Sequence, residues 1–118
     1  MNSEYIVSKD QIKWINRKYG GSLRSDAEIE SALHLGKGKA VFRKIAYLWR
    51  AILVGHPFTD GNKRTALMVS LAIIKACKIK AGKGVSESLV SEIRKIAKEN
   101  ITDINRIERL IRYAVTGD

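Results

Sequence analysis

The stretches AVFRKIAYLWRAILVG (residues 40–55) and NKRTALMVSLAIIKAC (residues 62–77) decide the fold of this chain. In both, apolar residues recur at the three- and four-residue spacing of a helix, and further apolar residues fill the flanks. A helix that is apolar on several faces belongs in the interior of a bundle. The sequence therefore predicts two buried central helices, over residues 39–54 and 62–77, in an all-α protein.

Capping signals predict two shorter helices before this pair. Ser8 is followed three residues later by Gln11, and Ser25 by Glu28, which is the spacing of the capping box at a helix start. In both cases glycine follows the apolar stripe, and Gly36 closes the second helix.

Two more helices are predicted after the central pair. A turn around residues 82–84, which could hold a short extended stretch, precedes an amphipathic stripe over residues 89–97. Thr102 is the expected N-cap of the last helix, whose apolar stripe runs over residues 104–114. The prediction is a compact bundle of about six helices that forms a single domain over residues 1–118.

The composition is that of a soluble globular protein, with 45% hydrophobic and 29% charged residues. The N-terminus lacks a basic region followed by an apolar run, and no apolar stretch approaches the roughly 20 residues that span a bilayer. The single cysteine, Cys77, allows no intramolecular disulfide and, with two histidines, no structural zinc site of the usual kind. We therefore expect a cytoplasmic protein without a membrane partner.

The net charge of +10 calls for a partner of opposite sign: nucleic acid, an acidic protein or the phosphates of a nucleotide. Lysines and arginines are scattered along the chain, without an arginine-rich tail or interleaved aromatic residues. We interpret them as a solvated basic surface rather than as a nucleic-acid groove.

The helical pattern breaks between the two central helices, where a polar loop precedes the second one. Asn62 can cap that helix, which would leave the amides of Lys63, Arg64 and Thr65 and the positive end of the helix dipole facing the loop. Gly61 removes a side chain that would keep a phosphate from the backbone. Two cations placed against the dipole indicate a ligand that carries several negative charges.

The same loop contains His56, Phe58 and Asp60. A histidine with a pKa near neutrality can take a proton from an attacking hydroxyl, and an aspartate beside a polyphosphate can hold a magnesium ion. Phe58 is expected to anchor the loop in the core. From these residues alone, an ordinary structural loop and a site for phosphoryl or nucleotidyl transfer both stay open.

The segment HPFTDGNKRTAL (residues 56–67) resembles the signature HxFx(D/E)GNxR of the Fic/Doc superfamily. Residues 18–33, 46–55 and 105–115 are similar to the layout of Doc, the death-on-curing toxin of toxin-antitoxin modules. The resemblance covers most of the chain and implies an all-α Fic/Doc-like bundle whose active-site loop joins two buried central helices.

The resemblance also implies roles for individual residues. His56 would be the general base for a serine, threonine or tyrosine hydroxyl of a target protein, and Asp60 would bind Mg²⁺. Gly61 and Asn62 would line the anion hole, and Arg64 would hold a phosphate of ATP.

Lys63 departs from the pattern of Fic adenylyltransferases, which carry glycine there and an arginine at the position of Leu67. Doc carries lysine and lacks that arginine. A bulky cation at Lys63 would occupy space that glycine leaves for phosphates, so the resemblance to Doc implies a reversed ATP and transfer of the γ-phosphate. Doc has alanine at the position of Gly61, whereas the glycine here matches Fic and keeps adenylylation open.

By analogy with Doc, the target would be a translation factor such as elongation factor Tu, whose phosphorylation inhibits translation. Residues 88–92 resemble the inhibitory motif of some Fic proteins only partly, because Ile93 follows, and we expect ordinary helix surface there. Restraint would then come from a separate acidic antitoxin. Three functions remain: a Doc-like kinase toxin, a Fic-type adenylyltransferase, and a non-catalytic basic module that binds nucleic acid or a regulator.

Other residues receive structural interpretations. Trp14 and Trp49 are expected in the core or lining a groove, although Trp49 is close enough to the loop in sequence to keep a nucleobase platform open. His34 is expected on the surface or in a packing contact. Cys77 lies on an apolar stripe and should be inert. Residues 19–26 are expected to form a mobile segment that receives the target peptide, as in the family, although their two glycines also end the first helix.

Overall fold

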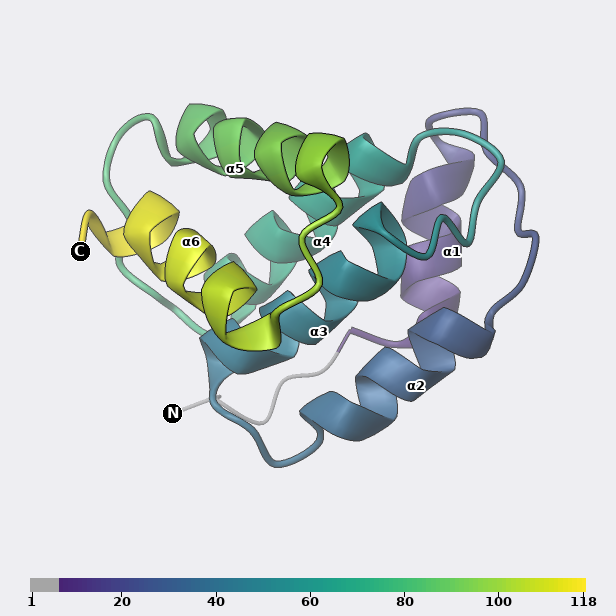
Figure 1. Cartoon of the computed structure of the whole chain (residues 1–118), viewed down its shortest axis with the longest axis horizontal. Helices are drawn as coiled ribbons and strands as arrows, with labels where there is room; N and C mark the ends of the chain where they lie inside the picture. The colour runs from purple at the N-terminus through teal and green to yellow at the C-terminus, as the bar shows by residue number, and fades with distance from the viewer. Residues whose placement is uncertain (1–6) are drawn as a thin grey trace.

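Six helices connected by loops account for residues 7–118, the part of the chain that this computed structural model describes (Figure 1). They are α1 (Lys9–Arg17), α2 (Ala27–Gly36), α3 (Val41–Leu53), α4 (Asn62–Ala76), α5 (Val85–Glu99) and α6 (Ile104–Thr116). The predicted all-α, Fic/Doc-like bundle is confirmed, and the two central helices end within two residues of their predicted bounds.

Helix α3 forms the centre of the bundle and contacts α2, α4, α5 and α6. In Figure 1, α3 and α4 run through the middle, with α5 and α6 on one side and α1 and α2 on the other. Ile45, Trp49 and Ile52 of α3 are fully buried. The indole N–H of Trp49 donates a hydrogen bond to the hydroxyl of Ser70 on α4, so Trp49 belongs to the core, as predicted.

The helix starts agree with the sequence only in part. The capping box at Ser8 is present, with its hydroxyl accepting from the Gln11 amide at 3.1 Å. The box predicted at Ser25 is wrong: Asp26 is the N-cap residue of α2, and its carboxylate accepts from Lys9 Nζ at 3.0 Å instead of capping the helix. The cap of α6 is Asp103 rather than Thr102.

The expectation that Trp14 lies in the core or lines a groove is wrong, because the residue is 55% exposed. It lies on the face of α1 that points away from the buried Ile12 and Asn16, and the Lys18 ammonium lies 4.1 Å from its ring centroid. Residues 79–84 form a coil and a turn, and they contain no strand or bridge that would match the short extended stretch considered near residues 82–84. None of the helices in residues 7–118 combines the length and apolar character needed to cross a lipid bilayer.

Candidate active site

The loop between α3 and α4 is anchored to the core by Phe58, which is only 1% exposed, as predicted. The Asn62 carboxamide holds the backbone of Phe58: its Nδ2 donates to the Phe58 carbonyl at 3.0 Å, and its Oδ1 accepts from the Phe58 amide at 3.3 Å. The predicted N-cap role of Asn62 is therefore wrong. Its side chain closes the loop, and Asn62 is the first residue of α4.

Gly61 is the N-cap residue of α4 and has a left-handed backbone, with φ of 74°. Its carbonyl accepts from the Thr65 amide at 2.9 Å, so the Thr65 amide is not free, contrary to the prediction. Within residues 7–118, the amides of Asn62, Lys63 and Arg64 have no acceptor. The start of α4 thus offers three backbone donors and the positive end of its dipole to an anion.

His56 begins the loop in a conformation that side chains rarely adopt, with φ of 50°. A left-handed non-glycine residue is strained, and such strain persists only where the surrounding structure enforces it, frequently at functional sites. The side chain is exposed and lines the same cleft as the start of α4. His56 can therefore meet a ligand at that helix terminus.

Asp60 presents an exposed carboxylate at the other end of the loop, where its Oδ1 accepts from the Gly61 amide at 2.8 Å. Residues 7–118 contain no cluster of three His, Cys, Asp or Glu side chains that could hold a metal ion. A single carboxylate beside an anion site fits the way in which Mg²⁺ is usually held, by one or two carboxylates together with the phosphates of a nucleotide.

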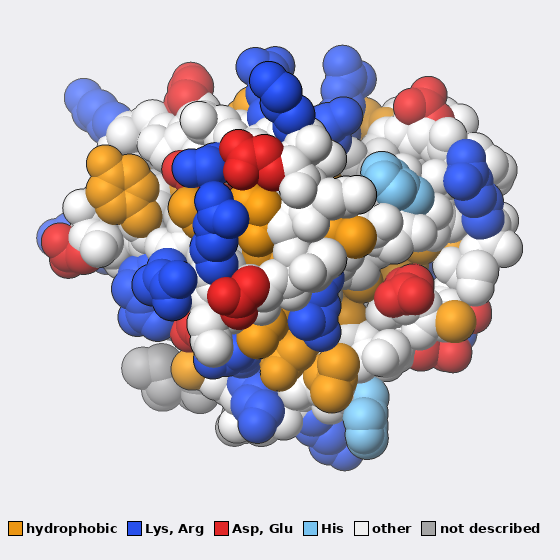
Figure 2. Space-filling view, in the orientation of Figure 1, with side chains coloured by type: hydrophobic (Ala, Val, Ile, Leu, Met, Phe, Trp, Pro, Cys, Tyr) orange, Lys and Arg blue, Asp and Glu red, His pale blue; other side chains and the backbone are white. Residues whose placement is uncertain are grey.

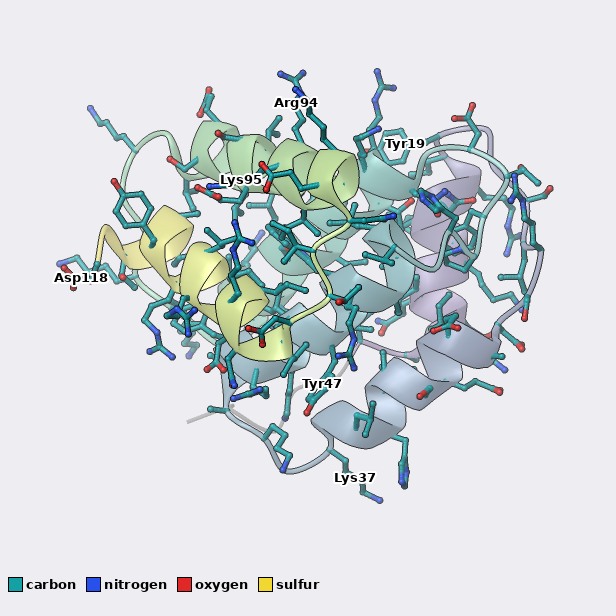
Figure 3. All side chains as sticks on the ribbon, in the orientation of Figure 1. Tyr19, Lys37, Tyr47, Arg94, Lys95 and Asp118 are labelled. Atoms are coloured by element: carbon teal, nitrogen blue, oxygen red, sulfur yellow. The ribbon has the colours of Figure 1, made fainter. Side chains whose placement is uncertain are left out.

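A cleft of about 470 Å³ brings these groups together. Its lining residues are Tyr19, Leu53, His56, Thr59, Asp60, Gly61, Asn62, Lys63, Arg64 and Ala97. All six residues that the sequence singled out as candidate site residues are therefore in one cleft. Figure 3 shows Tyr19 between the ends of α1 and α5.

The two cations of the first turn of α4 differ in their surroundings. Both Lys63 and Arg64 are exposed. The Arg64 guanidinium lies over the Tyr19 ring, 5.7 Å from its centroid, whereas Lys63 forms no ion pair within residues 7–118. The ring restrains Arg64 without neutralising it.

Residues 22–24 are hydrogen-bonded to the loop, while the mobility expected for residues 19–26 and their contact with a target peptide stay predictions. Leu23 pairs with Phe58 in an isolated antiparallel bridge. The Arg24 amide donates to the Pro57 carbonyl at 2.7 Å, and the Thr59 amide donates to the Ser22 carbonyl at 2.9 Å. This segment and the loop therefore form one hydrogen-bonded unit.

The sequence interpretation missed Asn16, Leu53 and Ala97 as parts of the site or its support, and it placed Tyr19 only within a segment over the site. Asn16 is 1% exposed and contacts the loop from α1, while the other three line the cleft. For Asn16, the sequence held one signal of a supporting role: it is a polar residue four positions after Ile12, on the buried face of an amphipathic helix. Leu53 and Ala97 gave none, because apolar residues at helical spacing indicate only a core.

A model described as the Fic/DOC family matches residues 7–74, which run from the start of α1 through most of α4 and include the whole loop. Neither the curated proteins nor the solved structures give a significant match. The family match spans more than half of the chain and contains every residue of the HPFTDGNKR segment. The chain therefore belongs to the Fic/DOC family.

Proposed function

We propose that this protein is a Doc-like toxin kinase, which transfers the γ-phosphate of ATP to a serine or threonine hydroxyl of a target protein. Membership of the Fic/DOC family indicates a nucleotide-dependent transferase in general. The choice of phosphoryl transfer rests on one observation, the exposed Lys63 side chain in the lining of the cleft at the first turn of α4. As the resemblance to Doc implies, a bulky cation at this position would occupy space that a glycine would leave for phosphates.

His56 acts as the general base in this proposal. The oxygen of the target hydroxyl forms a bond to the γ-phosphorus while the bond from that phosphorus to the β,γ-bridging oxygen breaks, and ADP leaves. The hydroxyl proton passes to the imidazole of His56. The exposure of His56 and its place in the cleft support this role.

The start of α4 neutralises the phosphates. The amides of Asn62, Lys63 and Arg64 and the two side-chain cations would bind the phosphate oxygens, and Gly61 leaves the backbone accessible. Asp60 would hold Mg²⁺, which supplies charge neutralisation when bound with the nucleotide. In this class of reaction, positioning and charge neutralisation account for most of what a protein contributes.

The alternative, adenylyl transfer, loses part of its support once Gly61 is seen in its surroundings. A Cβ added there would lie 3.0 Å from Tyr19 Cβ and 3.2 Å from Asn16 Nδ2. Packing against Tyr19 and Asn16 therefore explains this glycine without reference to the transferred group. A non-catalytic basic module has less support, because Figure 2 shows Lys and Arg spread over this face with acidic side chains between them.

We further propose that the target is a translation factor such as elongation factor Tu, which would place the protein in the cytoplasm, and that its restraint comes from a separate acidic antitoxin. The net charge of +10 favours an acidic partner through electrostatic complementarity.

The test is the intact mass of candidate targets, elongation factor Tu first, after incubation with this protein, ATP and Mg²⁺. We expect a gain of about 80 Da, one phosphoryl group, that is absent with His56→Ala. A gain of about 329 Da, one adenylyl group, would refute the kinase assignment. An unchanged yield with His56→Ala would refute the role of His56.

Lys63→Gly tests the basis of the choice between the two transfers. If Lys63 sets the orientation of ATP, this variant loses phosphoryl transfer and gains adenylyl transfer. The same product at the same rate as the wild type would show that Lys63 does not set the orientation.

A further inference from the structure

Asn16 of α1 is a buried polar residue that the reaction described above does not use. Its carboxamide Nδ2 donates to the backbone carbonyl of Asp60 at 2.8 Å and to the hydroxyl of Thr65 at 3.0 Å. Asn16 and Thr65 are 1% and 0% exposed. One amide group therefore holds both the last part of the loop and the first turn of α4.

The bond to Asp60 controls the direction of the next amide. In a trans peptide the C=O and N–H groups point in opposite directions. Because Asn16 holds the Asp60 carbonyl towards α1, the Gly61 N–H points away from α1, where it donates to the Asp60 carboxylate at 2.8 Å. Both the Gly61 amide and the Asp60 carboxylate thus take their direction from Asn16.

The backbone packs closely around the Asn16 carboxamide. A Cβ added to Gly21 would lie 2.3 Å from Asn16 Oδ1 and 2.3 Å from the Asp60 carbonyl oxygen. One added to Gly61 would lie 3.2 Å from Asn16 Nδ2. Such close contacts leave the carboxamide little room to rotate, so that its two hydrogen bonds keep one geometry.

We propose that Asn16 is a positioning residue of the transfer site, which sets the Asp60–Gly61 peptide plane and, through the hydrogen bond from the Gly61 amide, places the Asp60 carboxylate for Mg²⁺. This inference rests on the proposed function, because it assigns Asn16 to the same cleft. Asn16 is buried behind the loop and acts through Asp60 and Gly61, without contact with the nucleotide.

Asn16→Ala removes both hydrogen bonds. We expect the folded variant to transfer phosphate roughly 100-fold more slowly, because a displacement of about 1 Å at a reacting centre costs that much. The Mg²⁺ concentration for half-maximal rate should rise on the order of 10-fold, as it does when an indirect partner of a metal ligand is lost. Isothermal titration with Mg²⁺ and ATP should show a matching loss of affinity.

Ser70→Ala is the matched control, since Ser70 is 0% exposed and also makes two hydrogen bonds but lies outside the cleft lining. It should lower the melting temperature and leave the Mg²⁺ dependence unchanged. Asn16→Asp is the second variant should Asn16→Ala fail to fold, because it keeps the side-chain volume and removes both amide donors. A rate and a half-saturating Mg²⁺ concentration within about twofold of the wild type in a folded Asn16 variant would overturn the proposal.

One measurement separates this inference from the proposed function. The amide resonance of Gly61 in a ¹⁵N-labelled sample reports the Asp60–Gly61 peptide plane without any ligand. If wild-type protein modifies no target, the proposed function fails, while an unshifted Gly61 resonance in the Asn16 variants would independently refute the positioning role.

Discussion

Replacing Gly61 by alanine should destabilise the protein more than glycine replacement at other left-handed positions. Its φ of 74° costs an alanine roughly 1–2 kcal/mol by itself. The new methyl group would also lie 3.0 Å from Tyr19 Cβ and 3.3 Å from the Tyr19 carbonyl oxygen, neither of which is the flexible end of a side chain. Relieving such overpacking typically costs about 1–3 kcal/mol.

Gly38→Ala supplies the control. Gly38 has nearly the same φ, 76°, but an added Cβ would have no atom within 4 Å. Both replacements restrict the unfolded chain equally, so that effect cancels in the difference between them. The free energy of unfolding of Gly61→Ala should therefore be lower than that of Gly38→Ala by roughly 1–3 kcal/mol, the cost of overpacking alone.

Urea denaturation followed by circular dichroism measures this difference directly, and thermal melts should show a gap of about 4 °C for each kcal/mol in a domain of this size. Equal stabilities of the two variants would refute the packing argument. The left-handed backbone at φ of 74° would then be the one structural reason for a glycine at position 61.

Three further predictions concern groups outside the cleft. The hydrogen bond from Lys9 holds the pKa of Asp26 below its usual 3.8. The contribution of this pair to stability is therefore present above pH 3.8 and is lost as the pH falls through the lowered pKa. Lys9→Ala should raise the pKa of Asp26, measured by carboxyl NMR, and an unchanged pKa would contradict the pairing. Burial raises the pKa of the Cys77 thiol, so iodoacetamide at pH 8 should label the native protein far more slowly than the urea-unfolded one, and equal rates would contradict burial. Iodide should quench the fluorescence of Trp14, which is 55% exposed, and should not quench that of the buried Trp49. Trp14→Phe should therefore abolish most of the quenching. Persistent quenching in this variant would contradict the burial of Trp49.

The fold could be predicted because its main signal is long and redundant. Two apolar stretches define α3 and α4, and their expected bounds, 39–54 and 62–77, match Val41–Leu53 and Asn62–Ala76 closely. Helix caps were predicted less well because several residues compete for each cap. At α2, a lysine on another helix takes the carboxylate of the N-cap residue, and no local pattern encodes that choice.

The candidate site was predictable where it is local. The residues from His56 to Arg64 are close in the chain, and the same short segment that carries the motif also forms most of the cleft. The support of that segment could not be predicted. Asn16 lies 44 residues from Asp60, and a single asparagine on an amphipathic helix has many possible roles before the packing of α1 against α4 is known.

The dependence of the loop on α1 has a consequence for hydrogen exchange. Helix α1 has nine residues, fewer than the roughly 12–15 that make an isolated helix even marginally stable in water, so it owes its existence to packing against α4 and α2. Native proteins open in cooperative units, and a unit with few contacts opens at a lower free energy than the core. Detachment of α1 would remove the donor of the Asp60 carbonyl, and we expect α3 to α6 to stay assembled, because they contact one another without α1. The amides of α1 should therefore exchange before those of the core, and each opening of this helix would dismantle the cleft in a protein that otherwise remains folded.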